Sequence, residues 1–382
     1  MSDNRNINKL NLDKKIIENS NINFLIGSGA SIPFFGVLSN IENWLTALEQ
    51  DKNLPEKEKL YLKAIFYNVY FNTAMKGNLN ILKENFLNKS DDLSYVKNNY
   101  KKFFETIYEL IFKRKSSLSK QINIFTTNID IFHEYILDEL NYDFNDGFWG
   151  RFNPKLDLSS FRRTFHKESL FFNKISEIPI FNIYKIHGSV TWKYENNEII
   201  FDLNLSQLKK IESLLKSINL PTIDKDKEYE EVKNQVDFEK LEEEKEKIEE
   251  FIKAYEQLQI INPTKEKFQE TVFRKNHYEL LRIFANELEK ENTILIVFGF
   301  SFADEHIRDI VIRALNYNPL LNIFVFDYNG EGVKAIENEK SKIKNNNLHI
   351  IKPDENNKYN FETINKEFLK ILNEIKDTNE KN

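Results

Sequence analysis

Short runs of almost uninterrupted apolar residues recur along this chain of 382 residues, and each run ends in small or polar side chains. Such runs are typical of strands that are buried on both faces, as in a parallel sheet covered by helices. The predicted strands are residues 22–26, 122–125, 183–186, 294–298 and 323–326, with 348–351 as a candidate sixth.

A helical pattern follows the fourth of these runs. Apolar residues recur there at the spacing of one helix face, at Ile307, Ile310, Val311, Ala314 and Leu315. Asp304 stands just before them, in a position suited to the first turn of a helix. The alternation of strand and helix predicts an α/β fold, a Rossmann-like parallel sheet with helices on both faces.

Two long segments between the strands have a helical pattern of their own. We expect one domain over residues 1–382, with its core at 15–40, 119–202 and 261–382 and with helical insertions at 41–118 and 203–260. The second insertion contains FEKLEEEKEKIEEFIKAYEQL, in which apolar residues fall on heptad positions that Lys245 interrupts. The stretch is too short and too irregular for a coiled coil, so we interpret it as a helical hairpin with a solvated, charged surface.

The composition excludes several classes of function. The chain has no cysteine, which rules out disulfides, a cysteine nucleophile and a zinc site built on thiolates. Its formal net charge of −6 argues against DNA binding over the whole surface, and direct nucleic-acid binding is not expected. No apolar run approaches the roughly 18–20 residues that span a bilayer. The polar start MSDNRNINKLNLDKK also lacks the apolar stretch of a secretion signal, so we expect a cytoplasmic protein without membrane contact.

The chemistry is expected at one edge of the sheet, because ligands of open parallel sheets bind outside the carboxyl ends of the strands. The residues that follow the predicted strands fit this rule, since they are small or carry hydroxyl, amide or acidic groups. In chain order they read GSGAS (27–31), TTNID (126–130), HGS (187–189), GFSFADEH (299–306) and DYNG (327–330).

Taken singly, each of these segments also has a plainer explanation. Gly27 and Gly29 allow the close approach of a pyrophosphate, but an ordinary strand-to-helix turn explains them equally well. Asn128 and Asp130 offer hydrogen-bonding groups for a ligand, whereas capping of the next helix would also account for them. A lone histidine such as His187 is more often structural than catalytic. No pair among the six histidines has convincing metal spacing, so no metal site is expected.

In their order along the chain, GSGAS, TTNID, HGS and GFSF resemble the sirtuin family, whose motifs run G-A-G-x-S, T-Q-N-x-D, H-G and G-x-S. The resemblance covers roughly residues 20–40, 120–135, 180–192 and 290–330 and leaves the insertions outside it. The segment VFGFSFADEHI looks especially like the bacterial sirtuin-like proteins of antiphage defence, some of which pair with a HerA-type ATPase.

The chain departs from the sirtuin pattern at informative places. Thr127 stands where the family has glutamine, and Ser28 stands where it has alanine. The protein-deacylating sirtuins carry a four-cysteine zinc ribbon after the H-G motif, and this chain has a charged helical stretch there instead. The missing ribbon counts against the binding of an acylated peptide and leaves NAD chemistry intact.

The resemblance implies NAD+ as the substrate and assigns roles to the strand ends. His187 would act as general base, and Asn128 and Asp130 would grip the ribose and the nicotinamide region. The residues expected to contact the rest of the dinucleotide are Gly27, Ser28, Gly29, Ala30, Ser31, Thr127, Gly299, Ser301 and Asp327.

With water as the default acceptor, the expected reaction is the hydrolysis of NAD+ to ADP-ribose and nicotinamide in antiphage defence. An unregulated enzyme of this kind would kill its host. We therefore expect a latent homo-oligomer that responds to a HerA-type ATPase partner or to a phage-derived trigger. Two alternatives stay open: an NAD-dependent protein deacylase, and a non-catalytic sensor of ADP-ribose or another nucleotide within a defence complex.

Overall fold

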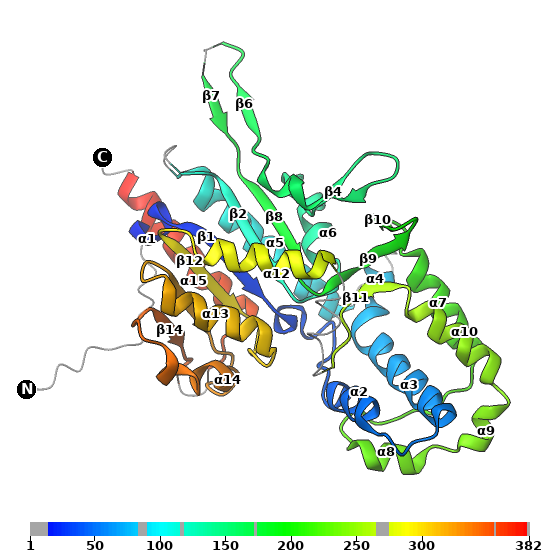
Figure 1. Cartoon of the computed structure of the whole chain (residues 1–382). Coiled ribbons are helices and arrows are strands. Elements are labelled where there is room, and N and C mark those ends of the chain that lie inside the picture. Colours follow the sequence, from blue (N-terminus) through cyan, green and yellow to red (C-terminus); the bar gives the residue numbers. More distant parts are fainter. Residues whose placement is uncertain are drawn as a thin grey trace, which may run out of the picture.

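The computed structural model of the chain describes residues 14–82, 90–114, 118–171, 174–264, 275–354 and 357–379. Within these ranges a seven-stranded sheet forms the centre of the molecule, with the strand order β14-β13-β12-β1-β2-β8-β3 (Figure 1). All its neighbouring strands run parallel. The strands are β1 (Asn21–Ile26), β2 (Gln121–Thr126), β3 (Phe144–Asn145), β8 (Ile180–Lys185), β12 (Thr293–Phe298), β13 (Asn322–Phe326) and β14 (Leu348–Ile351).

Helices cover both faces of this sheet, and alternate residues of each strand point into different cores. On β1, Phe24 belongs to the core under helices α5 (Asp91–Phe112) and α15 (Phe361–Asn379). The next residue, Leu25, belongs to the core under α12 (Lys275–Leu288) and α13 (Glu305–Tyr317). Burial on both faces explains the near-continuous apolar runs, and the predicted α/β fold is confirmed.

A second, five-stranded sheet is antiparallel and was not predicted. Its strands are β4 (Phe148–Trp149), β5 (Lys155–Leu156), β9 (Gly188–Glu195), β10 (Glu198–Phe201) and β11 (Leu258–Ile260), in the order β11-β9-β10-β5-β4. Most of these strands have two to four residues, which is too short for a recognisable period of two. A separate hairpin of β6 (His166–Glu168) and β7 (Ile175–Glu177) projects away from the body (Figure 1).

The two segments expected to be helical insertions contain helices that pack on one another. The first contributes α2 (Ile41–Gln50), α3 (Glu56–Tyr70), the π-helical turn η2 (Phe71–Met75) and α4 (Gly77–Leu82); the second contributes α7 (Ser206–Ser217), α8 (Tyr229–Gln235), α9 (Phe238–Glu242) and α10 (Lys245–Tyr255). Helix α3 contacts α9 and α10, and α2 contacts α8. We call these helices the helical unit, and they lie together on one side of the sheet (Figure 1).

Shorter elements complete the described chain. They are α1 (Lys14–Asn19), η1 (Ser28–Ser31), α6 (Phe132–Glu139), η3 (Leu158–Arg162), α14 (Lys334–Glu337) and η4 (Lys340–Lys342). In the described ranges, none of the helices combines the length and the apolar character needed to cross a bilayer.

Candidate active site

The turn after β1 and the loop after β12 pack backbone against backbone. The amide of Gly27 donates to the Phe298 carbonyl at 3.1 Å, and the amide of Gly29 donates to the Gly299 carbonyl at 2.9 Å. A Cβ on Gly27 would lie 2.4 Å from the Gly299 carbonyl oxygen, and one on Gly29 would lie 2.7 Å from the Gly299 Cα. Glycine is therefore needed at both positions because a side chain would clash with the backbone of the Gly299 loop.

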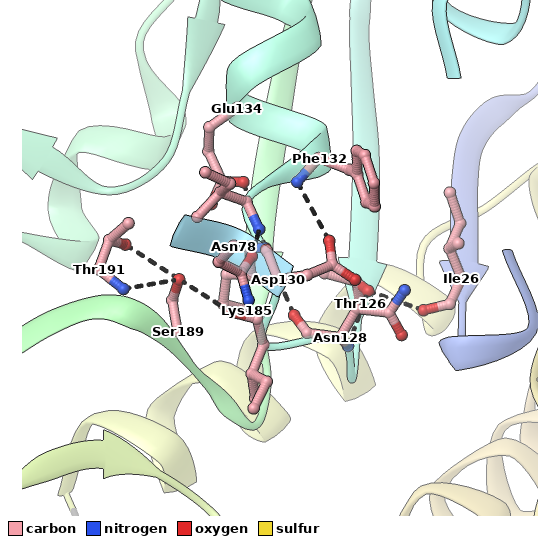
Figure 2. Close-up of polar contacts among 12 residues, drawn as sticks. Ile26, Asn78, Thr126, Asn128, Asp130, Phe132, Glu134, Lys185, Ser189 and Thr191 are labelled. Carbon is pink, nitrogen blue, oxygen red and sulfur yellow. Dashed lines mark hydrogen bonds and ion pairs between the residues drawn. The ribbon is translucent and has the colours of Figure 1, made fainter. Parts of the chain in front are cut away.

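Asn128 is fixed at the end of β2 with one side-chain atom left over. Its Nδ2 donates to the Gly27 carbonyl at 3.1 Å and lies 3.3 Å from the Ser31 hydroxyl, and its amide donates to the Thr126 hydroxyl at 3.0 Å. Thr126 in turn donates to the Ile26 carbonyl at 2.8 Å (Figure 2). The Asn128 Oδ1 is buried and has no hydrogen-bond partner. A buried acceptor without a partner is costly, so this oxygen is suited to a donor group on a ligand.

Asp130 lies beside Asn128 and shares a partner with it. Its Oδ2 accepts from the Ser31 hydroxyl at 2.8 Å, and its Oδ1 accepts from the Phe132 amide at 3.1 Å. Burial raises the pKa of Asp130, an effect that nearby Lys185 and the Ser31 hydrogen bond oppose. Ser31, Asn128 and Asp130, all expected at the site from the sequence, thus form one hydrogen-bonded cluster.

Lys185, the last residue of β8, contacts the loop that carries Asn128 and Asp130. This role was not predicted from the sequence. Its side chain is 1% exposed. The ammonium group donates to the Asn128 carbonyl at 3.3 Å and to the Asp130 carbonyl, and it pairs with Glu134 Oε2 at 3.2 Å (Figure 2). Burial raises the pKa of Glu134. An ordinary strand lysine points to solvent, so only its position at the end of an apolar run marked Lys185 as unusual.

Two side chains from the first predicted insertion also reach the site. The Tyr100 hydroxyl of α5 lies 3.1 Å from the Ser31 hydroxyl, and burial raises its pKa well above the usual value. The Asn78 side chain of α4 accepts from the Ile131 amide at 3.1 Å (Figure 2). The sequence held no sign of either contact, because both residues lie in helices outside the recognisable motifs.

His187 follows β8 and faces the loop after β12. Its Nε2 lies 3.1 Å from Asp304 Oδ2, and the two side chains are 15% and 7% exposed. Gly188 beside it has a φ of +76°, and a Cβ there would lie 1.9 Å from the Gln259 carbonyl oxygen. The Val190 amide donates to the Ile129 carbonyl at 3.0 Å, which ties this segment to the one that carries Asn128. Only the helix-capping role of Asp304 was foreseen from the sequence.

The remaining predicted contact residues lie around this cluster in different environments. Ser28 and Ser301 are exposed, Thr127 and Gly299 are half-buried, and Ala30 is buried. Asp327, after β13, is fully buried, and its Oδ1 accepts from the Gly332 amide at 2.9 Å. Its Oδ2 is buried without a hydrogen-bond partner. No contact joins Asp327 to the cluster in the described part of the chain, so its role toward a ligand stays a prediction.

The geometry so far brings four strand ends into one continuous set of contacts. Bonds join the Gly27 turn to the Gly299 loop and to Asn128, the Asn128 loop to Lys185, and His187 to Asp304. Among the described residues, no group of three or more histidine, aspartate or glutamate side chains is placed to hold a metal ion.

A family model of the SIR2-like domain matches residues 122–351, more than half of the chain. The chain belongs to the SIR2-like family. The matched range contains Asn128, Asp130, His187 and Gly299, whereas the Gly27 turn precedes it. Comparison with curated proteins gives no match. Membership of the SIR2-like family implies the use of NAD+ and confirms the resemblance to sirtuins at the level of the family.

Proposed function

We propose that this SIR2-like protein is an NAD+ glycohydrolase, which converts NAD+ and water to ADP-ribose, nicotinamide and a proton. The observation that carries the proposal is the buried, unpartnered Oδ1 of Asn128 in a loop that Thr126, Gly27 and Lys185 hold in place. A fixed acceptor of this kind is suited to the hydroxyl groups of a ribose or to an attacking water.

The reaction breaks the bond between the ribose C1′ and the nicotinamide nitrogen, and the electron pair leaves with nicotinamide. The Asp130 carboxyl group, buried beside Asn128, stabilises the positive charge that develops on the sugar. Asn128 holds the ribose or the water, His187 accepts a proton from the water, and the water oxygen bonds to C1′. Each of these residues lies at the carboxyl edge of the sheet, where ligands of such folds bind.

Water is the acceptor that the chain favours. The absence of cysteine excludes the zinc ribbon of the protein-deacylating sirtuins. After the H-G motif the chain instead forms β9, β10 and the helices α7 to α10. Nothing in the described part of this arrangement repeats the ribbon, so hydrolysis is the reaction that we propose.

The proposal is tested by nicotinamide release from NAD+ in extracts of phage-infected cells that express one of four proteins: wild type, Asn128→Ala, His187→Gln and His166→Gln. The first two variants should lose at least about a hundredfold in turnover, the usual contribution of a general base or of a fixed polar group. His166 is an exposed histidine on β6, so His166→Gln serves as the matched control and should retain full activity.

The alternatives give different results in the same assay. A deacylase would release nicotinamide only when an acylated peptide is added. A sensor would bind ADP-ribose in calorimetry and release no nicotinamide under any condition. The first result would support the deacylase and the second the sensor, and either would contradict the hydrolase proposal.

We further propose that the activity is latent in the cytoplasm and is released during phage infection, through a phage-derived trigger or a HerA-type ATPase partner of the homo-oligomer. Cells that carry the wild-type protein should lose NAD+ after infection, and cells that carry His187→Gln should not. Equal NAD+ contents in the two infected cultures would contradict the defence role. The homo-oligomer is tested separately, by measuring the molar mass of the purified protein with light scattering.

A further inference from the structure

Asp304 divides its two carboxylate oxygens between a helix and a histidine. Oδ1 accepts from the amides of His306 and Ile307 at 3.1 and 3.2 Å and so caps α13. Oδ2 lies 3.1 Å from the Nε2 of His187. The cap fixes the orientation of the carboxylate, and with it the position of the oxygen that faces the imidazole ring.

The chain is pinned on both sides of this contact. Arg308 donates to the Phe302 carbonyl at 2.8 Å, and Phe302 itself has a φ of +60°, which is unusual for a bulky residue. On the other side, the His187 carbonyl accepts from the Ile261 amide at 2.9 Å. Both partners are therefore held by hydrogen bonds that do not depend on the contact between His187 and Asp304.

An ionised carboxylate only accepts hydrogen bonds, so the ring nitrogen that faces it must carry the proton. In the neutral form of His187 that nitrogen is Nε2, and the lone pair is then on Nδ1. In the described ranges, Nε2 is the His187 ring nitrogen with a hydrogen-bonding partner. Nδ1 is thus available to a ligand.

We propose that Asp304 is a positioning residue that fixes the tautomer of His187, so that Nδ1 is the nitrogen that takes a proton from water. This inference rests on the proposed hydrolysis and specifies which atom of the general base acts. Asp304 touches neither substrate nor water in this role; it acts through the imidazole ring.

Asp304→Asn is the variant that separates this role from helix capping. Asparagine is as good an N-cap as aspartate, and capping two amides requires its oxygen at the Oδ1 position. The amide nitrogen then replaces Oδ2 and donates to Nε2, which forces the ring proton onto Nδ1 and removes the base. We expect a loss of turnover of at least about a hundredfold, with unchanged ADP-ribose affinity and unchanged melting temperature.

Asp304→Ser is the matched control. Serine also caps helices well, but its side chain is too short to place a donor on the ring. The ring then loses its orienting partner without being forced into the wrong tautomer. This variant should therefore retain more activity than Asp304→Asn, whereas a purely structural role would affect both alike.

The tautomer of His187 can be determined by NMR spectroscopy, without an activity assay. In protein with ¹⁵N-labelled histidine, two-bond ¹H–¹⁵N spectra distinguish a protonated ring nitrogen from one with a lone pair, and the spectrum of His187→Gln identifies the His187 signals among the six histidines. The wild type should show the proton on Nε2 and Asp304→Asn should show it on Nδ1. A wild-type ring protonated on Nδ1, or equal and measurable turnover in both proteins, would overturn the inference. If the tautomers are as expected but the wild type releases no nicotinamide even in extracts of phage-infected cells, the hydrolase proposal fails and the assigned pairing stands.

Discussion

Lys185 shows how much one buried side chain decides in this protein. Its ammonium group donates to the carbonyls of Asn128 and Asp130 and pairs with Glu134, and the Lys185 and Glu134 side chains are only 1% and 10% exposed. Removing one member of a buried ion pair leaves the other charged and unpaired. The orientation of the Asn128 loop therefore depends on a lysine that does not itself belong to the recognisable motif.

We predict that Lys185→Met lowers the free energy of unfolding by about 3–5 kcal/mol, because Glu134 and two carbonyls lose their partner. The double variant Lys185→Met with Glu134→Leu should be less destabilised than the single variant, since no charge is then left buried. Urea denaturation of the two proteins and the wild type measures both effects. A double variant less stable than the single one would contradict the assigned pair.

The pH dependence of stability gives a second prediction at this scale. Burial raises the pKa of Glu134 above its usual value, so the folded protein binds this proton more tightly than the unfolded chain does. Its contribution to stability is therefore largest in acid and is lost as the pH rises through the folded pKa. Because Glu134→Gln cannot ionise, the stability of this variant relative to that of the wild type should rise as the pH increases from about 4 to about 8. Denaturation at several pH values tests the sign.

At the scale of elements, the H-G motif joins the two sheets. β8 belongs to the parallel sheet, and β9 begins at Gly188 and pairs with β11 in the antiparallel sheet. The chain changes direction within three residues, which requires the φ of +76° at Gly188. The position of His187 thus follows from the junction between two sheets.

Gly188→Ala should lower the stability of the fold far more than Gly330→Ala, which is its matched control. Both glycines have positive φ, at +76° and +88°, so alanine costs about 1–2 kcal/mol of backbone strain at either position. Only at Gly188 does the new Cβ also meet backbone, the Gln259 carbonyl oxygen, whereas nothing lies within 4 Å at Gly330. Melting temperatures of the two variants measure the difference, and equal values would mean that β11 does not lie where the structure places it.

At the scale of the whole molecule, segments far apart in the sequence share one helical unit. Tyr67 of α3 stacks on Tyr255 of α10, with ring centroids 3.9 Å apart. The Trp44 indole of α2 donates to the Lys227 carbonyl at 2.8 Å. Through Asn78 the same unit contacts the Asn128 loop, so the helices expected to be separate insertions are joined to the site.

Tyr255→Ala should therefore destabilise both parts of the unit together, by about 3–5 kcal/mol, as for other large aromatic residues in a core. Hydrogen exchange is the decisive measurement, because it reports each helix separately. Faster exchange is expected in α3 as well as in α7 and α10. Faster exchange confined to residues 245–255 would show that the two segments fold independently.

The sequence by itself determined the parallel sheet, the edge at which its strands end and the polar residues of that edge. It did so because burial on both faces leaves a local apolar pattern, and because all carboxyl ends of a parallel sheet meet on one side. Only the tertiary structure decided that Lys185 supports the Asn128 loop, that Tyr100 and Asn78 reach it, and that Asp304 faces His187. These contacts join side chains from different elements, and the antiparallel sheet joins strands of two to eight residues. Neither leaves a periodic trace in the chain, because each depends on how elements distant in the sequence pack in space.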